Sequence, residues 1–106
     1  MADSLQGTLD LLILKTLQMG PNHGFGITLH IQNASKGLLQ VEEGSLYPAL
    51  HRLERDRLVK AEWQTTANRR RARVYTLTPA GRKRLGEAEA NWTTLAKGVN
   101  HLLRYV

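Results

Sequence analysis

Residues 42–56, with the sequence EEGSLYPALHRLERD, decide the fold that we predict for this chain. The stretch reads as a helix from about residue 44 to residue 56. Leu46, Leu50 and Leu53 then lie at the i, i+4, i+7 spacing of a buried stripe. The spacing therefore predicts a helix whose leucine side packs into the core of a small domain.

The opposite face of this helix is polar and cationic. It carries Ser45, Tyr47, Pro48, His51, Arg52 and Arg55. Pro48 lacks an N–H and is tolerated only near a helix start, so it supports a beginning at residues 43–45. The first turns of this helix also have unpaired backbone N–H groups and the positive end of the helix dipole. Both favour the binding of a phosphate there. This face suits the DNA major groove, although the stretch alone also fits a surface helix of an ordinary bundle.

The charge distribution points to a polyanionic partner. The chain has 106 residues, enough for one domain with a modest core, and a formal net charge of +6. Eleven of its fifteen Lys and Arg residues lie between Arg52 and Arg84, where only three acidic residues oppose them. That region therefore carries a net +8, and the remainder of the chain carries −2.

Several function classes are disfavoured by composition. The chain has no cysteine, and its four histidines form no i, i+4 pair, so we expect no metal site, no cofactor and no enzyme. Glu42 and Glu43 are a poor acid/base pair because adjacent helix residues point apart. Residues 1–4 show no basic start of a signal peptide, and no apolar run approaches the roughly 18 residues of a membrane span. We expect a soluble cytoplasmic protein that does not contact membranes.

The segment from residue 5 to residue 19 reads as a helix that is apolar on nearly all sides. Leu11 and Leu14 lie on a different side from Leu9 and Leu12, so more than one face must be covered. A partner subunit could provide the second cover. Burial inside a single compact core is the alternative.

Residues 20–41 contain a turn, a helix and a short strand. Residues 20–24 are a turn by composition, with Asn22 as a plausible N-cap. Residues 25–31 alternate like a strand, but Ile27 and Ile31 also fit a helical stripe, and we favour a helix that ends with Gly37 at C′. A phosphate-binding loop at residues 20–26 is disfavoured, since no strand precedes it and no Gly-Lys-Ser/Thr ends it. Residues 38–41 would form a brief edge strand.

A hairpin is predicted after residue 58. Residues 59–64 alternate as a half-buried strand, and residues 74–78 form a second strand in which Tyr75 and Leu77 share a face. The tip, residues 65–73, carries Arg69, Arg70, Arg71 and Arg73. A tip of this kind is suited to enter a narrow minor groove of DNA or to bind the flanking phosphates. The alternative is a loop that only faces solvent.

The last helix is predicted to begin with Thr78 as N-cap and Pro79 at its first position. Apolar residues then recur at 3,4 spacing, as in a coiled-coil seam. They are Leu85, Ala88, Trp92, Leu95, Val99, Leu102 and Val106. A helix of this length cannot be buried in so small a domain, so its natural partner is a second copy together with the outer face of the first helix. Trp92 is a hydrophobic anchor there and a candidate wall for a ligand pocket.

In this arrangement the chain resembles the PadR-like family of winged helix-turn-helix transcriptional regulators. The resemblance rests on residues 43–54, residues 77–82 and, more weakly, residues 23–27. It implies that the recognition helix lies at residues 43–54 and that members act as dimeric repressors, some of which release DNA on binding a small molecule. Arg57 stands where the family often has glycine, and the chain stops after one C-terminal helix, as in the short branch.

The predicted fold is therefore mainly α with a small β-wing. Residues 1–78 would form a winged helix-turn-helix domain and residues 79–106 a dimerisation helix, in one compact unit. The predicted function is that of a dimeric repressor that binds a palindromic double-stranded DNA operator. A small aromatic molecule is the expected kind of effector. The alternative is a winged helix that binds another protein. The candidate DNA contacts are Ser45, Tyr47, Pro48, His51, Arg52, Arg69, Arg70, Arg71 and Arg73. The candidate dimer contacts are Leu11, Leu14, Ala88, Trp92, Leu95, Val99 and Leu102.

Overall fold

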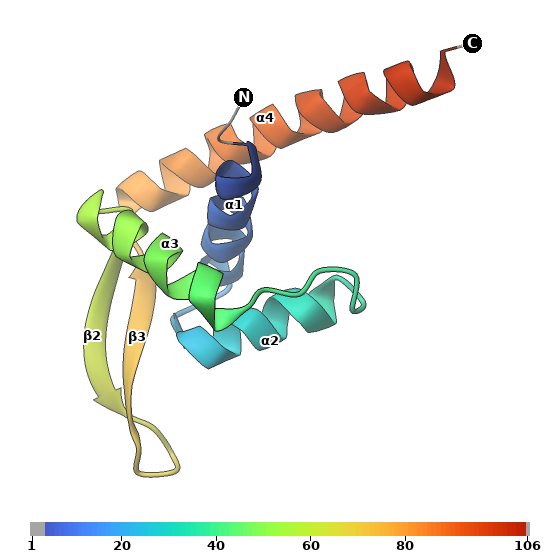
Figure 1. Cartoon of the computed structure of the whole chain (residues 1–106). Coiled ribbons are helices and arrows are strands. Elements are labelled where there is room, and N and C mark those ends of the chain that lie inside the picture. Colours follow the sequence, from blue (N-terminus) through green and yellow to red (C-terminus); the bar gives the residue numbers. More distant parts are fainter. Residues whose placement is uncertain (1–3, 106) are drawn as a thin grey trace.

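The computed structural model describes residues 4–105, with side chains described from residue 7 onward. The predictions for residues 1–3 and for Val106 lie outside the described residues. The elements are α1 (Ser4–Gln18), β1 (Asn22–His23), α2 (Gly24–Ala34), α3 (Glu43–Arg55), β2 (Val59–Thr65), β3 (Arg71–Leu77) and α4 (Pro79–Arg104). The strands form one antiparallel sheet in the order β1-β3-β2 (Figure 1). The predicted fold class, mainly α with a small β-wing and a long last helix, is confirmed.

The core lies where α1, α2, α3 and the base of the sheet meet. Leu46, Leu50 and Leu53 of α3 are buried there, as their spacing predicts, together with Ala49. Leu14 is also completely buried within the single chain. Its own chain covers this side chain because α1 passes through the middle of the fold, and its predicted role at a subunit contact stays a prediction.

The helix prediction for α2 is confirmed, but its N-cap and the nearby edge strand differ from the prediction. His23, not Asn22, caps α2: its Nδ1 atom accepts a hydrogen bond from the backbone N–H of Gly26, at 3.1 Å. Asn22 and His23 instead form β1, which pairs with β3. Residues 38–41 form no strand. The N–H of Leu39 donates to the Ser35 hydroxyl at 3.0 Å, which holds this segment against the end of α2.

Both α2 and α3 end in a Schellman motif whose C′ residue is left-handed and is not glycine. At the end of α2 the C′ residue is Lys36, with φ 57°, and Gly37, one position further along than predicted, is left-handed as well, with φ 80°. At the end of α3 the C′ residue is Arg57, with φ 60°. The N–H of Leu58 donates to the carbonyl of Leu53 at 2.9 Å, which closes the second motif.

Arg57→Gly is expected to raise the free energy of unfolding by about 1 kcal/mol, because glycine adopts the left-handed conformation without the clash that a Cβ causes. Urea denaturation measures the change. Arg57→Ala is the matched control, since it removes the charge and keeps the Cβ. An equal gain in both variants would mean that charge, rather than backbone conformation, limits stability at this position.

The junction between the sheet and α4 is built around Thr78 and Gly81. Thr78 is the N-cap as predicted: its Oγ1 atom accepts from the N–H of Gly81 at 3.0 Å and donates to the carbonyl of Leu58 at 3.0 Å. A Cβ on Gly81 would collide with that same carbonyl oxygen. The close approach of α4 to the backbone of Leu58 therefore requires glycine.

Gly81→Ala is expected to lower the free energy of unfolding by about 3 kcal/mol, because the carbonyl that blocks the new methyl group belongs to the backbone and cannot rotate away. Thermal and urea denaturation measure the loss. Gly86→Ala is the control, since this glycine lies in the same helix with nothing within 4 Å of the added Cβ. There alanine should gain up to about 1 kcal/mol from helix propensity. Equal effects at both positions would contradict the proposed collision.

The hairpin is longer than the sequence pattern indicates. β2 and β3 pair from Val59 opposite Leu77 to Thr65 opposite Arg71. Arg71 and Arg73 therefore lie in a strand, and only residues 66–70 form the tip. Arg69 adopts the left-handed conformation there, with φ 59°, in a turn closed by its N–H and the carbonyl of Thr66 at 2.9 Å.

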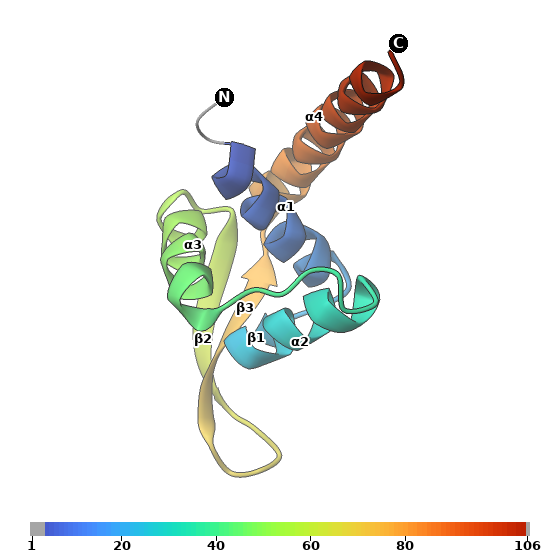
Figure 2. The same cartoon turned by 45° about the vertical axis from the view of Figure 1, so that its right-hand side comes forward.

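The tip of the hairpin and the free end of α4 lie at opposite ends of the molecule (Figures 1 and 2). The first half of α4 packs against α1, where Lys15 and Glu89 form an ion pair of 3.0 Å. The second half runs past the core and leaves Val99 46% and Leu102 73% exposed. Among the described residues, no helix is both long enough and apolar enough to cross a membrane.

Candidate nucleic-acid interface

One exposed stripe runs along the outer side of α3. Ser45, Pro48 and His51 are exposed on it, opposite the buried leucines. Arg55 continues the same stripe, and its side chain is 71% exposed. Its Nε atom lies 3.4 Å from Oδ1 of Asp56. The helix thus presents a hydroxyl, an imidazole and a guanidinium along one line, which are groups that hydrogen-bond to base edges and phosphates.

Tyr47 lies at the contact between α3 and α2. A Cβ added to Gly24, the first residue of α2, would come within 2.8 Å of the Tyr47 hydroxyl oxygen. The phenol ring therefore packs over the start of α2 while remaining 41% exposed. Gly24 allows this approach, and the hydroxyl stays at the edge of the exposed stripe.

Arg52 is turned toward the interior of the fold. Its Nη2 atom donates to Asp10 Oδ1 of α1 at 3.1 Å, and both side chains are about three-quarters covered, with 27% and 26% exposed. Arg52 Nε is buried without a partner among the described residues. Burial raises the pKa of the Asp10 carboxyl, although the Arg52 guanidinium opposes this shift. Arg52 thus ties α3 to α1.

Arg73 links the wing to the recognition helix. Its Nη2 atom donates to Glu54 Oε2 of α3 at 2.6 Å. Burial raises the pKa of the neighbouring Tyr75 phenol, and the Arg73 charge opposes that rise. The ion pair fixes the angle between the hairpin and α3, so Arg73 holds the two elements together and is itself largely neutralised.

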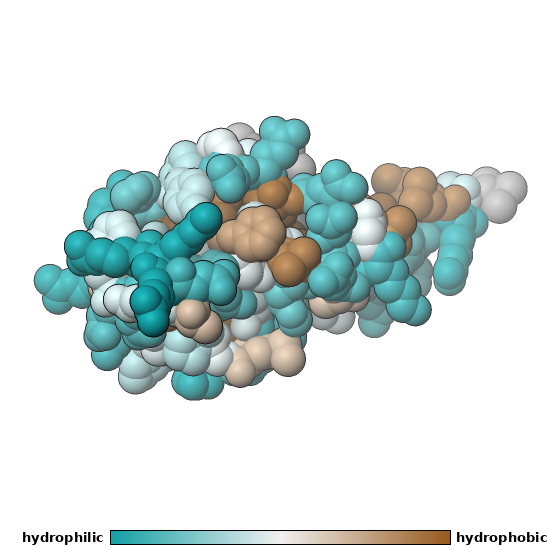
Figure 3. All heavy atoms as spheres, turned by 90° about the horizontal axis from the view of Figure 1, so that it is seen from below, coloured by the Kyte–Doolittle hydropathy of each residue, from teal (hydrophilic) through white to brown (hydrophobic). Residues whose placement is uncertain are grey.

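The remaining wing arginines are free of such pairing. Arg69, Arg70 and Arg71 are exposed, and within residues 4–105 none of them forms an ion pair. Figure 3 shows the underside of the molecule, where the wing presents a strongly hydrophilic surface. Like charges placed this close repel one another unless an anion lies between them.

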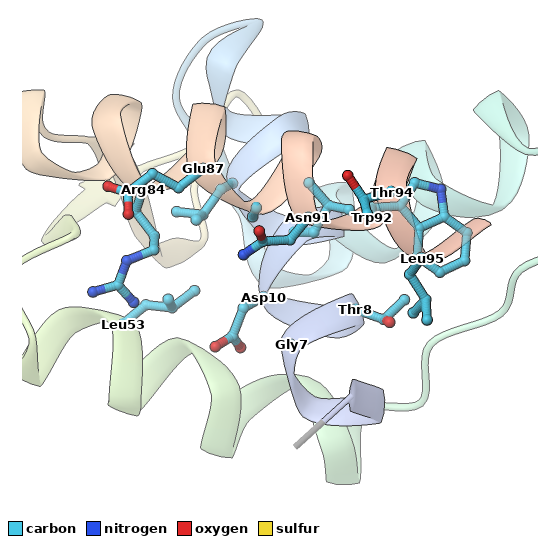
Figure 4. Close-up of a pocket in the computed structure, with 13 residues that line it drawn as sticks. Gly7, Thr8, Asp10, Leu53, Arg84, Glu87, Asn91, Trp92, Thr94 and Leu95 are labelled. Atoms are coloured by element: carbon cyan, nitrogen blue, oxygen red, sulfur yellow. The ribbon is translucent and has the colours of Figure 1, made fainter. Parts of the chain in front are cut away.

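A cleft of about 770 Å³ lies between α1 and α4 (Figure 4). Trp92 and Leu95 line one end, and Asp10 and Arg84 line the polar end. Leu11 and Ala88 also line it and are only partly buried. No cluster of three or more potential metal ligands occurs among the described residues.

The fold and this surface define a winged helix-turn-helix DNA-binding protein: a helix with an exposed polar stripe, a basic hairpin beside it and a shared core. Residues 13–87 match the model of the transcriptional regulator PadR-like family, and the chain belongs to that family. The resemblance inferred from the sequence is thereby confirmed. The protein is a DNA-binding transcriptional regulator and not an enzyme, as members of this family are regulators.

Relatives agree with this assignment. A transcriptional regulator of Mycobacterium tuberculosis is 43% identical over 77 residues, which cover 73% of this chain and 68% of the relative. The structure of a transcriptional regulator from Clostridium thermocellum has a TM-score of 0.86 and 27% identity, with 96% of this chain and 99% of that chain covered. A PadR-like transcription factor from Bacteroides fragilis has a TM-score of 0.76 and 35% identity, with 95% of each chain covered.

Three features of this surface are not among those that the sequence predicts. Arg55 is exposed on the stripe but is absent from the predicted contacts, although its position on the helical face could identify it. The partners of Arg52 and Arg73, which are Asp10 and Glu54, gave no pattern that could have been recognised. Gly24 leaves room for the ring of Tyr47 because α2 and α3 cross at this point. The sequence around Gly24 does not predict that crossing.

Proposed function

We propose that the chain is a homodimeric, sequence-specific regulator of double-stranded DNA that acts as a repressor. The observation that carries the proposal is the juxtaposition of the exposed stripe of α3 with the unpaired arginines of the adjacent wing. In this arrangement α3 enters the major groove and the wing reaches the neighbouring minor groove. The repressor role rests on the family resemblance. We place its action in the cytoplasm.

The proposed contacts divide into base-reading and phosphate-binding groups. Ser45, Pro48 and His51 face the bases or the phosphates beside them, and the partly exposed Tyr47 contacts DNA at the edge of the same surface. The phosphate-binding group is Arg69, Arg70, Arg71 and Arg55. We assign Arg52 and Arg73 to positioning α3, because each is bound to a carboxylate on another element and is largely covered. Arg55 differs, since its partner Asp56 is the next residue and both side chains are exposed.

The proposed dimer uses α4, within the predicted dimerisation segment of residues 79–106, as its dimerisation helix. Trp92, Val99 and Leu102 are exposed along one side of it, and Leu103 widens that side. The cleft lined by Leu11, Ala88 and Leu95 would receive the partner's helix. A single helix with this much exposed apolar surface gains most by pairing with its own copy. A two-fold dimer requires a palindromic operator.

Trp92 is the proposed wall of an effector site for a small planar aromatic molecule. It lines the cleft and is 47% exposed in the single chain. Stacking on the indole ring would quench its fluorescence. A titration with planar aromatic compounds tests this, and a response that persists in Trp92→Leu would assign the binding to another place.

A competition gel shift tests the proposed function. The probe is the DNA upstream of the protein's own coding region, and the competitor is a mixed-sequence duplex in excess. The complex should resist the competitor, and footprinting should reveal two symmetric half-sites about 10 bp apart. Transcription from the bound promoter should fall. Complete displacement by the competitor would contradict sequence specificity, and absence of any DNA binding would favour the protein-interaction alternative.

A further inference from the structure

The register of the hairpin defines an inner face of the wing. Residues paired across antiparallel strands point to the same side of a sheet. Val59 pairs with Leu77 and Ala61 with Tyr75, and three of these four side chains are buried against the core. The same face continues outward through Trp63 opposite Arg73 and Thr65 opposite Arg71. These eight residues form the inner face of the wing.

Beyond the core, this inner face is still turned toward α3. The evidence is the ion pair of Arg73 with Glu54, which crosses from the face to the recognition helix at 2.6 Å. The distal half of the hairpin then projects past α3 (Figures 1 and 2). A helix in the major groove and a hairpin in the next minor groove straddle one phosphate strand. The inner face of the wing is therefore directed at that strand.

Trp63 is an unusual residue to leave on this face. Its side chain is 58% exposed, although a large aromatic ring is usually mostly buried. The Arg71 guanidinium carbon lies 5.2 Å from the centre of its ring, and that of Arg73 lies 5.9 Å away. Both distances are within the range of a cation–π contact. The ring thus holds two guanidinium groups on the side that faces α3.

The two arginines differ in what else they bind. Arg73 is paired with Glu54, which offsets its charge. Arg71 forms no ion pair within residues 4–105 and has Trp63 as its support. A guanidinium stacked on a ring is held in place while its N–H groups remain free to donate, and it loses less freedom when it binds an oxyanion. Arg71 is therefore preorganised for one more anionic group.

We propose that Trp63 and Arg71 form a phosphate clamp on the inner face of the wing. Arg71 donates hydrogen bonds to a backbone phosphate of the DNA strand that passes between α3 and the wing. Trp63 is a positioning residue that holds the guanidinium by stacking, and its exposed edge contacts the adjacent sugar. This inference rests on the proposed DNA binding and adds to it a specific phosphate site with an aromatic support.

The clamp predicts coupled effects on DNA binding. The probe is a labelled duplex of mixed sequence, because a phosphate contact acts on all sequences alike. Trp63→Leu should weaken binding about 3- to 10-fold, the range of a partly exposed cation–π contact, and Trp63→Phe should restore most of the loss. Arg71→Ala should lower the slope of log affinity against log salt by about 1 per subunit. In the Arg71→Ala background, Trp63→Leu should then add little further loss, because Trp63 acts through Arg71.

The matched control is Gln64→Leu, a neighbouring exposed position on the outer face of the same strand, which should bind like the wild type. DNA should also quench tryptophan fluorescence in the wild type and not in Trp63→Leu. Melting curves check folding. Should Trp63→Leu fail to fold, Arg71→Lys replaces it, since lysine keeps the charge but cannot stack in the same way, and it should bind more weakly than wild type.

The outcomes separate the clamp from the proposed function. A wild-type protein without salt-dependent DNA binding would overturn both. Normal wild-type binding together with unchanged affinity of Trp63→Leu, or of Arg71→Lys where that variant stands in, would overturn the clamp alone. Fully independent losses in the Trp63→Leu and Arg71→Ala variants would show that Trp63 does not act through Arg71, which also overturns the clamp.

Discussion

Leu95→Glu combined with Val99→Glu is expected to convert the proposed dimer into monomers and to abolish operator binding. A dimer of this variant would have to bury four carboxylates along one seam. Each unpaired buried charge costs several kcal/mol, which exceeds what the lost apolar contacts supplied. Val99 is 46% exposed in the single chain, so its change acts mainly on association. Sedimentation velocity measures the assembly, and circular dichroism checks that the helices remain.

The control for this variant is Ala90→Glu combined with Lys97→Gln. It changes the net charge by the same −2 at exposed positions of α4 outside the seam. We expect it to remain a dimer and to bind DNA. A folded wild-type monomer at micromolar concentration, or a seam variant that still sediments as a dimer, would show that the seam is assigned wrongly.

DNA affinity is expected to fall by about 10³- to 10⁵-fold between roughly 50 and 200 mM salt. This estimate assumes that a dimer neutralises about 6 to 10 phosphates, each of which releases condensed counterions when a cation binds. Fluorescence anisotropy at a series of salt concentrations measures the slope. A flat response would contradict a binding mode based on the basic surface of α3 and the wing.

Paired variants locate the phosphate contacts within the basic region. Arg69→Ala with Arg70→Ala should lower the salt slope and weaken binding to all sequences, because these side chains are exposed at the tip of the wing. Arg82→Ala with Lys83→Ala removes the same charge at the start of α4, which adjoins the opposite end of the hairpin. It should change the slope little. Equal losses would indicate that net charge, rather than the position of the wing, controls binding.

Much of the fold could be inferred from short stretches of the chain. The leucine stripe of α3, the N-cap at Thr78 and the strand β2 depend on residues within a few positions of one another, and the structure confirms them. The predicted half-buried alternation holds only at the start of β2, because Trp63 is 58% exposed. The exposed stripe of α3 follows from the same periodicity, since the side opposite a buried stripe must face outward. The basic wing was likewise evident from four arginines in five residues.

The sequence does not predict contacts between residues that are far apart in the chain, because these contacts depend on how the elements pack. Arg52 and Arg73 look like free cations in the sequence, yet their carboxylate partners lie 42 and 19 residues away. Leu14, which the sequence pattern predicts as a subunit contact, lies in the core of the single chain because of the path that α1 takes. Residues 22–23 became a strand only because the edge of β3 lies beside them. Periodicity and capping depend on residues within one or two helical turns, so they can be predicted from short stretches of sequence. Which charges meet, and which remain free for a phosphate, depends on how helices cross and how far a hairpin extends.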